Sequence, residues 1–222
     1  MASSPRTPRV LKSGIVLLDP VTAAVRQPNG VIVLQYNPDT LTRTLQVQAT
    51  GSDGGDRSEA FRIKGPPVES LKLEAEIDAT DQLEFPDQNP AAAELGIFPQ
   101  LAVLETIVYP TSSQLVSSNA SQGSGQLEII PMEAPLTLFV WSRSRILPVR
   151  ITELSVTEEA FEASLSPMRA KVSIGMRVLT INDVGFTHKG GSLFMAYLRA
   201  KEQFATRLAG GALGALGLNG VP

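Results

Sequence analysis

Charged side chains on two strand-like segments have the clearest potential for chemistry in this sequence. In residues 68–78, apolar side chains alternate with acidic ones, which places Glu74, Glu76 and Asp78 on one face. Two carboxyl groups can hydrolyse a glycosidic bond, but only when they face each other at a defined distance. Three carboxylates on one open strand face instead favour a charged face in contact with solvent or with another subunit.

The second segment, residues 169–178, carries the opposite charge. Its apolar side chains alternate with Arg169, Lys171 and Arg177, as in an antiparallel strand with one buried face. In a ring, each subunit presents two different surfaces to its neighbours. An acidic face paired with a basic face would fix register and partner choice. We therefore predict that the two charged faces pair between subunits.

Three arginines, Arg143, Arg145 and Arg150, lie close in sequence to the single tryptophan, Trp141. Aromatic and arginine side chains stack on nucleic acid bases, so nucleic-acid binding is one interpretation. However, the chain has a net charge of −3 and a pI of about 5.3, whereas nucleic-acid-binding domains are usually basic. We favour an interface cluster and expect no nucleic-acid partner.

Other kinds of site find little support in the sequence. The chain has no cysteine and only one histidine, His188. This excludes zinc sites built from His and Cys, and any pair or triad of histidines. We expect His188 to be solvated in a glycine-flanked linker. Gly190-Gly191 before a helix could bind an anion, but no nucleotide motif precedes it. Residues 51–56, GSDGGD, lack the spacing of an EF-hand calcium loop and indicate a solvated loop. We expect no catalytic residue, no metal and no cofactor.

Strands must position the charged faces, and residues 135–180 give the clearest strand signals. Strand-like runs cover 136–141, 149–157 and 169–178. In the second run the alternation slips by one residue, which predicts a β-bulge near Thr152 and Glu153.

The remaining elements are assigned by periodicity and turn signals. Strands are predicted at 15–18 (an edge strand), 31–36 and 41–49, with a loop over 78–87. Apolar spacing predicts a short helix at 89–95 that continues after Gly96 to residue 108 and packs across the sheet. Residues 111–126 are polar and predict a long loop. The fold class is therefore mainly β with one packed α-helix.

Composition and patterning divide the chain into three parts. We expect a flexible N-terminal arm at 1–12, a β domain at 13–182, and a linker, helix (192–208) and Gly/Ala/Leu tail at 183–222. Hydrophobic residues make up 43% of the chain, enough to form a core. No segment approaches the ~20 apolar residues of a membrane span, and the apolar run near the N-terminus is too short for a secretory signal. We expect synthesis in the cytoplasm and no membrane insertion.

Five segments together resemble the tube-like baseplate protein of contractile injection systems, which are particles derived from phage tails. The segments are LQYNPDTLTRTL (34–45), PPVESLKLEAEIDATD (66–81), LAVLETIVYP (101–110), PLTLFVW (135–141) and PVRITELSVTEEAFEASLSPMRAKVSIGMRVL (148–179). The resemblance covers residues 12–182. Its specificity lies in the combination of Asn37-Pro38 after a strand, Pro148-Val149-Arg150 and SPMRA at 166–170.

The resemblance implies a phage tail-tube-like antiparallel β-barrel, followed here by a C-terminal helical extension. It implies a homo-hexameric ring between the trimeric spike hub and the inner tube, which templates tube growth. The implied partners are other copies of the chain, the spike/hub protein, the inner tube protein, and other baseplate or sheath components. The particle would be assembled after synthesis in the cytoplasm, and would either be released or act inside its producer. No residue of that family is catalytic, so none is carried over.

One departure from the family affects the C-terminus. Relatives often carry a LysM module after the tube domain, but here about 40 residues follow Asn182, without a LysM-like sequence. We expect the C-terminal helix and tail to dock on another baseplate or sheath component rather than to bind peptidoglycan. Two alternative functions remain: the main inner-tube subunit, and a non-catalytic β-barrel ligand-binding module, which predicts a concave pocket and a stable monomer.

Overall fold

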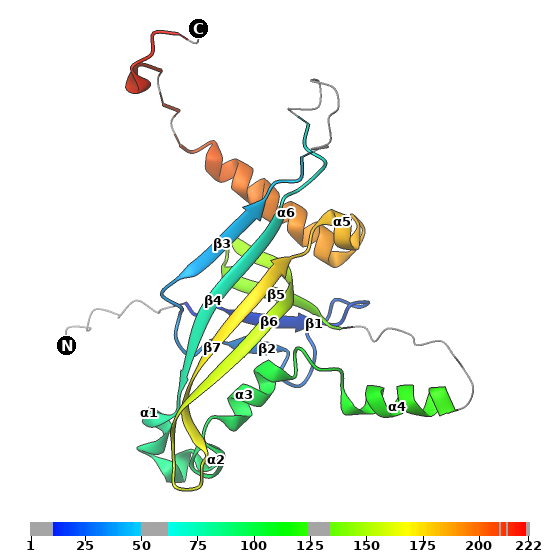
Figure 1. Cartoon of the computed structure of the whole chain (residues 1–222), viewed down its shortest axis with the longest axis vertical. Coiled ribbons are helices and arrows are strands. Elements are labelled where there is room, and N and C mark those ends of the chain that lie inside the picture. The colour runs from blue at the N-terminus through cyan, green and yellow to red at the C-terminus, as the bar shows by residue number, and fades with distance from the viewer. Residues whose placement is uncertain (1–10, 50–61, 124–133, 209, 212, 221–222) are drawn as a thin grey trace, which may run out of the picture.

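Seven strands form one antiparallel sheet in the computed structural model, which describes residues 11–49, 62–123, 134–208, 210–211 and 213–220. The order across the sheet is β2-β1-β5-β6-β7-β4-β3 (Figure 1). The strands are β1 (Gly14–Leu18), β2 (Val31–Val33), β3 (Leu41–Gln46), β4 (Val68–Asp78), β5 (Leu136–Ser142), β6 (Arg145–Phe161) and β7 (Pro167–Val178). The predicted loop at 51–56 and most of the predicted N-terminal arm lie outside the described residues.

The central strands follow the alternation in the sequence. In β7, Ala170, Val172 and Ile174 are buried while Arg169 and Lys171 are exposed. The register of β6 against β7 shifts between Ile151 and Glu153, which confirms the predicted β-bulge. Because of this shift, the apolar side chains of β6 face the core both before and after the bulge.

The core lies between two halves of a strongly curled sheet. Figure 1 shows β4 and β7 crossing in front of β1 and β2. Ile15 and Phe139 from β1 and β5 join Leu73 and Ile174 from β4 and β7 in one apolar cluster. This arrangement leaves the opposite face of β4 and β7 to polar side chains.

Two strand predictions need correction. β1 pairs with both β2 and β5, so it is an interior strand rather than an edge strand. β2 covers three residues and β3 ends at Gln46, so both are shorter than predicted. Within the described residues no ladder joins β2 to β3, and these two strands are the edges of the sheet.

The helices exceed the single one expected within the β domain. α2 (Pro90–Leu95) and α3 (Phe98–Glu105) confirm the predicted helical region, and Leu101 and Leu104 of α3 are buried in the core. However, α1 (Thr80–Leu83) and a 3-10 turn η2 (Pro86–Gln88) occupy the predicted loop at 78–87. The fold is therefore mixed α and β.

A further helix, α4 (Ser112–Gly123), replaces the predicted polar loop. It begins with a reciprocal cap: the Gln114 N–H donates to Thr111 Oγ1 (3.3 Å), and the Thr111 N–H donates to Gln114 Oε1 (2.9 Å). The sequence T-x-x-Q is a capping-box signature. Exposed Val116 and Leu115 show that little of this helix is buried among the described residues.

The C-terminal segment packs on the same core as the sheet. Thr180 and Asp183 form a capping box for α5 (Ile181–Val184), where the sequence had predicted a linker. α6 (Lys189–Ala205) starts three residues before the predicted Ser192. Its Phe194 and Tyr197 belong to the main apolar cluster, so α6 is packed rather than separate. The described part of the tail contains the 3-10 turn η3 (Leu213–Leu216), which is exposed.

His188 has a defined structural role instead of the expected solvated one. It is the N-cap of α6, and its Nδ1 accepts the N–H of Gly190 at 3.1 Å. This bond satisfies one of the free amides at the start of the helix.

Candidate interaction surfaces

The predicted acidic and basic faces lie side by side on one chain. β4 pairs with β7 in a register that puts Asp78 opposite Arg169 and Glu76 opposite Lys171. Arg169 and Asp78 form an ion pair at 2.8 Å. Both faces thus belong to the same polar side of the β4-β7-β6 region, opposite the core.

The basic residues of β7 all have partners within the chain. Lys171 lies 3.4 Å from Glu159, and Arg177 lies 2.7 Å from Asp183. Among the described residues, Glu74 and Glu76 form no ion pair. Pairing between subunits stays a prediction. Of the charged side chains predicted to take part in it, these two glutamates are the ones without an ion pair among the described residues.

Neighbouring groups lower the pKa of two carboxyl groups on this surface. Burial alone would raise the pKa of Asp78, but the hydroxyl and N–H of Thr80 and the Arg169 guanidinium outweigh it. Burial also acts to raise the pKa of Asp183, and Thr180 and Arg177 together lower it below its usual value. Both side chains are therefore held as carboxylates.

The three arginines predicted to cluster are separated. Arg150 lies on the outer face of β6, opposite Arg177. Arg143 is exposed in the β5–β6 turn. Arg145 lines a hollow together with Trp141. The structure therefore brings only one of the three arginines together with the tryptophan in a hollow.

We call this space the α6 hollow. It has a volume of about 270 Å³ and lies between β3, the β5–β6 turn and α6. Its lining residues are Arg43, Trp141, Ser142, Ser144, Arg145, Tyr197, Lys201 and Phe204. Three aromatic side chains line it, and its three cations make it more basic than the other four hollows described in this part of the chain.

A buried glutamate lies beside the α6 hollow. The Glu69 side chain is 4% exposed and forms ion pairs with Arg43 (2.8 Å) and Lys201 (3.0 Å). The Tyr197 hydroxyl donates to Glu69 Oε1 at 3.0 Å, and Lys201 Nζ lies 4.1 Å from the centre of the Tyr197 ring. These contacts connect β3, β4 and α6.

The ionisation of Glu69 depends on these partners. Burial is the largest effect and by itself raises the pKa, but Lys201 and Arg43 together hold the pKa of Glu69 below its ordinary value. This site was not predicted from the sequence. Its signal was present, because Glu69 occupies a core-facing position in the alternation of Leu71, Leu73 and Ala75. A charge at such a position requires a buried partner.

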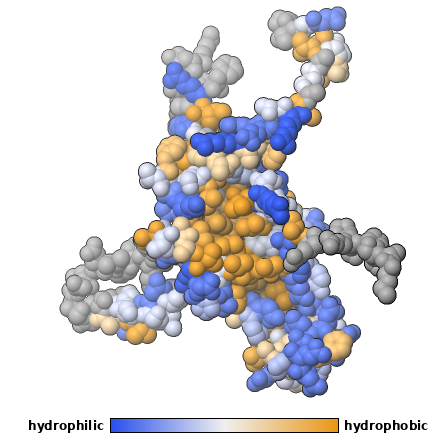
Figure 2. Space-filling view, turned by 180° about the vertical axis from the view of Figure 1, so that it is seen from behind, coloured by the Kyte–Doolittle hydropathy of each residue, from blue (hydrophilic) through white to orange (hydrophobic). Residues whose placement is uncertain are grey.

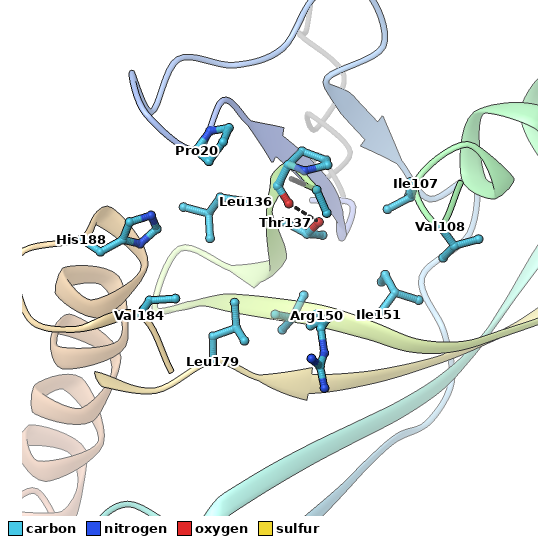
Figure 3. A pocket seen from close by; sticks show the side chains of 13 residues that line it. Pro20, Ile107, Val108, Leu136, Thr137, Arg150, Ile151, Leu179, Val184 and His188 are labelled. Carbon is cyan, nitrogen blue, oxygen red and sulfur yellow. Dashed lines mark hydrogen bonds between the residues drawn. The ribbon is translucent and has the colours of Figure 1, made fainter. Parts of the chain in front are cut away.

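A second hollow, of about 440 Å³, is mainly apolar (Figure 3). Leu136 and Thr137 of β5 and Ile151 of β6 line it, with His188 at one end. Figure 3 shows the Arg150 guanidinium pointing away from the other lining residues. No pair of titratable groups therefore converges here, as acid–base chemistry would require.

An apolar surface covers the far side of β2, β1 and β5. Figure 2 shows hydrophobic side chains gathered at the middle of the side turned away in Figure 1. Val31 and Val33 of β2 are 58% and 57% exposed. Val16 on β1 and Val140 on β5 are at neighbouring positions in the register and are partly buried. We call this surface, defined by Val16, Val31, Val33, Val140 and Ile146, the apolar face.

The described residues hold neither a metal-binding cluster nor a membrane-spanning helix. They contain no group of three or more His, Asp or Glu side chains placed to hold a metal ion. They also contain no helix with the length and apolar character needed to cross a bilayer.

No protein-family model matches the chain, and no curated protein matches it at a significant level.

Proposed function

We propose that this chain is a structural baseplate protein of a contractile injection system, which forms a homo-hexameric ring between the spike hub and the inner tube. The observation that carries the proposal is the apolar face on β2, β1 and β5 (Figure 2). A monomer rarely leaves a contiguous apolar surface over a sheet, and such surfaces mark sites of protein association. The five sequence segments resembling tube-like baseplate proteins add independent support.

The sheet edges also suit assembly with neighbours. β2 and β3 are unpaired on one side each within the described residues. Exposed edges are sites where another chain can add a strand, unless they are covered. In the proposed ring, neighbouring subunits would cover both the edges and the apolar face.

The tail-tube-like barrel is part of the proposal. The curled sheet brings the segment after β2 close to the end of β4, and there Gln35 bridges the opening. Its Nε2 donates to the Asp78 carbonyl at 2.7 Å, and its Oε1 accepts the Asp78 N–H at 3.0 Å. A side-chain amide thus replaces a backbone pair across the gap. Leu104 of α3 lines the hollow of about 360 Å³ beside it.

Quantitative mass spectrometry of purified sheathed particles tests the function. We expect about two copies of this chain for each copy of a trimeric spike protein, as one hexameric ring requires. Copies on the scale of the tube protein would instead make the chain the tube subunit. Absence of the chain from the particle would refute the proposal and leave a ligand-binding module as the alternative.

A further inference from the structure

The charges of this protein are segregated along its length. Residues 73–142 contain no lysine and no arginine. Within this stretch the segment from α1 to α2 carries four exposed carboxylates, and none has an ion pair among the described residues. We call them the acidic end: Asp81, Glu84, Asp87 and Glu94. In Figure 1, α1 and α2 lie at one end of the long axis.

The α6 hollow lies toward the opposite end, where Figure 1 shows β3 and α6. Its three cations, Arg43, Arg145 and Lys201, face a single carboxylate, Glu69. Glu69 is shared by Arg43 and Lys201, and Arg145 has no ion pair among the described residues. The hollow therefore has an excess of positive charge and one guanidinium ready for an anion.

The chemistry of the α6 hollow suits a carboxylate. An arginine fork binds a carboxylate through two parallel hydrogen bonds. Trp141 and Tyr197 line the same space, and apolar walls strengthen such a bond because they exclude water. A volume of about 270 Å³ accommodates an acidic side chain.

We propose that the α6 hollow binds carboxylates from the acidic end of a second copy of this chain, with Arg145 as the main ligand. The contact joins two different surfaces, so each copy has one free hollow and one free acidic end. Such a heterologous contact generates a ring if the rotation closes. The inference rests on the proposed function in one respect, because it names the contact that joins subunits of the proposed ring.

Sedimentation velocity of the purified full-length chain at low and high salt tests the contact. We expect the wild type to self-associate at low salt, and to do so less at high salt, because salt screens exposed charges. Arg145→Glu should weaken association by about tenfold or more, since it places like charges together. Arg199→Glu is the matched control, because Arg199 is an exposed residue of α6 outside the hollow and its charge change is the same. It should associate like the wild type.

A variant of the other surface makes the test reciprocal. Glu84→Lys/Asp87→Lys should also weaken association, and joining it with Arg145→Glu in one chain should restore association. A mixture of the two single-surface variants should also restore association, because each hollow then meets an end of opposite charge on the other variant. The proteins must retain the wild-type circular dichroism spectrum.

The outcomes separate this inference from the proposed function. A monomeric wild type, or an Arg145→Glu variant that associates like the wild type, overturns the contact. Either result leaves the copy number in particles, which tests the proposed function, unaffected. Conversely, association that depends on Arg145 in a chain absent from particles supports the contact and refutes the baseplate function.

Discussion

Glu69→Gln should lower the free energy of unfolding by about 2 kcal/mol. Glutamine keeps one side-chain oxygen, which can still accept a hydrogen bond from Arg43 or Tyr197. The variant therefore loses the hydrogen bond from Lys201 and the negative charge of both ion pairs. Hydrogen bonds to charged groups contribute roughly 1.5–3 kcal/mol each, and partial exposure of the cations reduces this value. Arg43 is 26% and Lys201 34% exposed, which places the effect near the lower part of that range.

Urea unfolding followed by Trp141 fluorescence measures this change, because the only tryptophan lines the α6 hollow. With a slope of about 2 kcal/mol per molar urea, the midpoint should fall by about 1 M. Glu74→Gln is the control, since Glu74 is exposed on the same strand and has no ion pair within the described part of the chain; its effect should stay within about 0.5 kcal/mol.

The pH dependence of the same measurement gives a second check. The folded-state pKa of Glu69 is lowered, so the stabilisation is complete above the ordinary value of 4.5 and is lost as the pH falls through the folded-state pKa. The difference between wild type and Glu69→Gln should therefore shrink below pH 4.5. An unchanged midpoint at pH 7, or a difference that does not shrink in acid, would refute the role assigned to the charge.

Three other substitutions test the packing around the surfaces. Gln35→Ala should cost about 2 kcal/mol in urea unfolding, because it removes two hydrogen bonds to the Asp78 backbone; an unchanged midpoint would contradict the bridge. Gly191→Ala should lower the melting temperature, since a Cβ would lie 1.9 Å from the Gly185 carbonyl oxygen, whereas Gly210→Ala, with open space around it, should not. Thr111→Ala should destabilise the first turn of α4 by about 1 kcal/mol, because it removes the cap, and should therefore speed amide hydrogen exchange there. The amides of β7 should exchange as in the wild type and serve as the reference.

The sequence predicted best those strands that have one buried face. Residues 68–78 and 169–178 alternate without interruption, and both are strands with the predicted side chains in the core. The β-bulge near Thr152 could also be predicted, because the alternation of apolar residues shifts by one position there. Alternation is less reliable at a sheet edge: the strand predicted at 41–49 is present as β3 but ends at Gln46, and the alternating Leu45 and Val47 are both exposed.

The missed elements have little apolar periodicity. α4 is polar, and only its cap, Thr111 with Gln114, indicates a helix. α6 was found, but its start was misplaced because His188, an uncommon N-cap, begins it. The neighbours of Glu69 could not be predicted either, since Arg43 and Lys201 are far from it in the sequence and only the tertiary fold brings them together.

These contacts change which charges are available to join subunits. To reach a neighbouring chain, Arg169, Lys171 and Arg177 must each leave an ion pair within their own chain. Exposed pairs contribute only ~0–1 kcal/mol, so exchanging one pair for an equivalent pair gives almost no net free energy. Arg145 and the carboxylates of the acidic end have no such pair to lose among the described residues, so the proposed contact with a second copy would add its full contribution. The charges most useful for assembly are therefore those that the fold leaves unpaired within the described residues. Of the charged side chains predicted to pair between subunits on the two strands that alternation revealed, only Glu74 and Glu76 are of this kind.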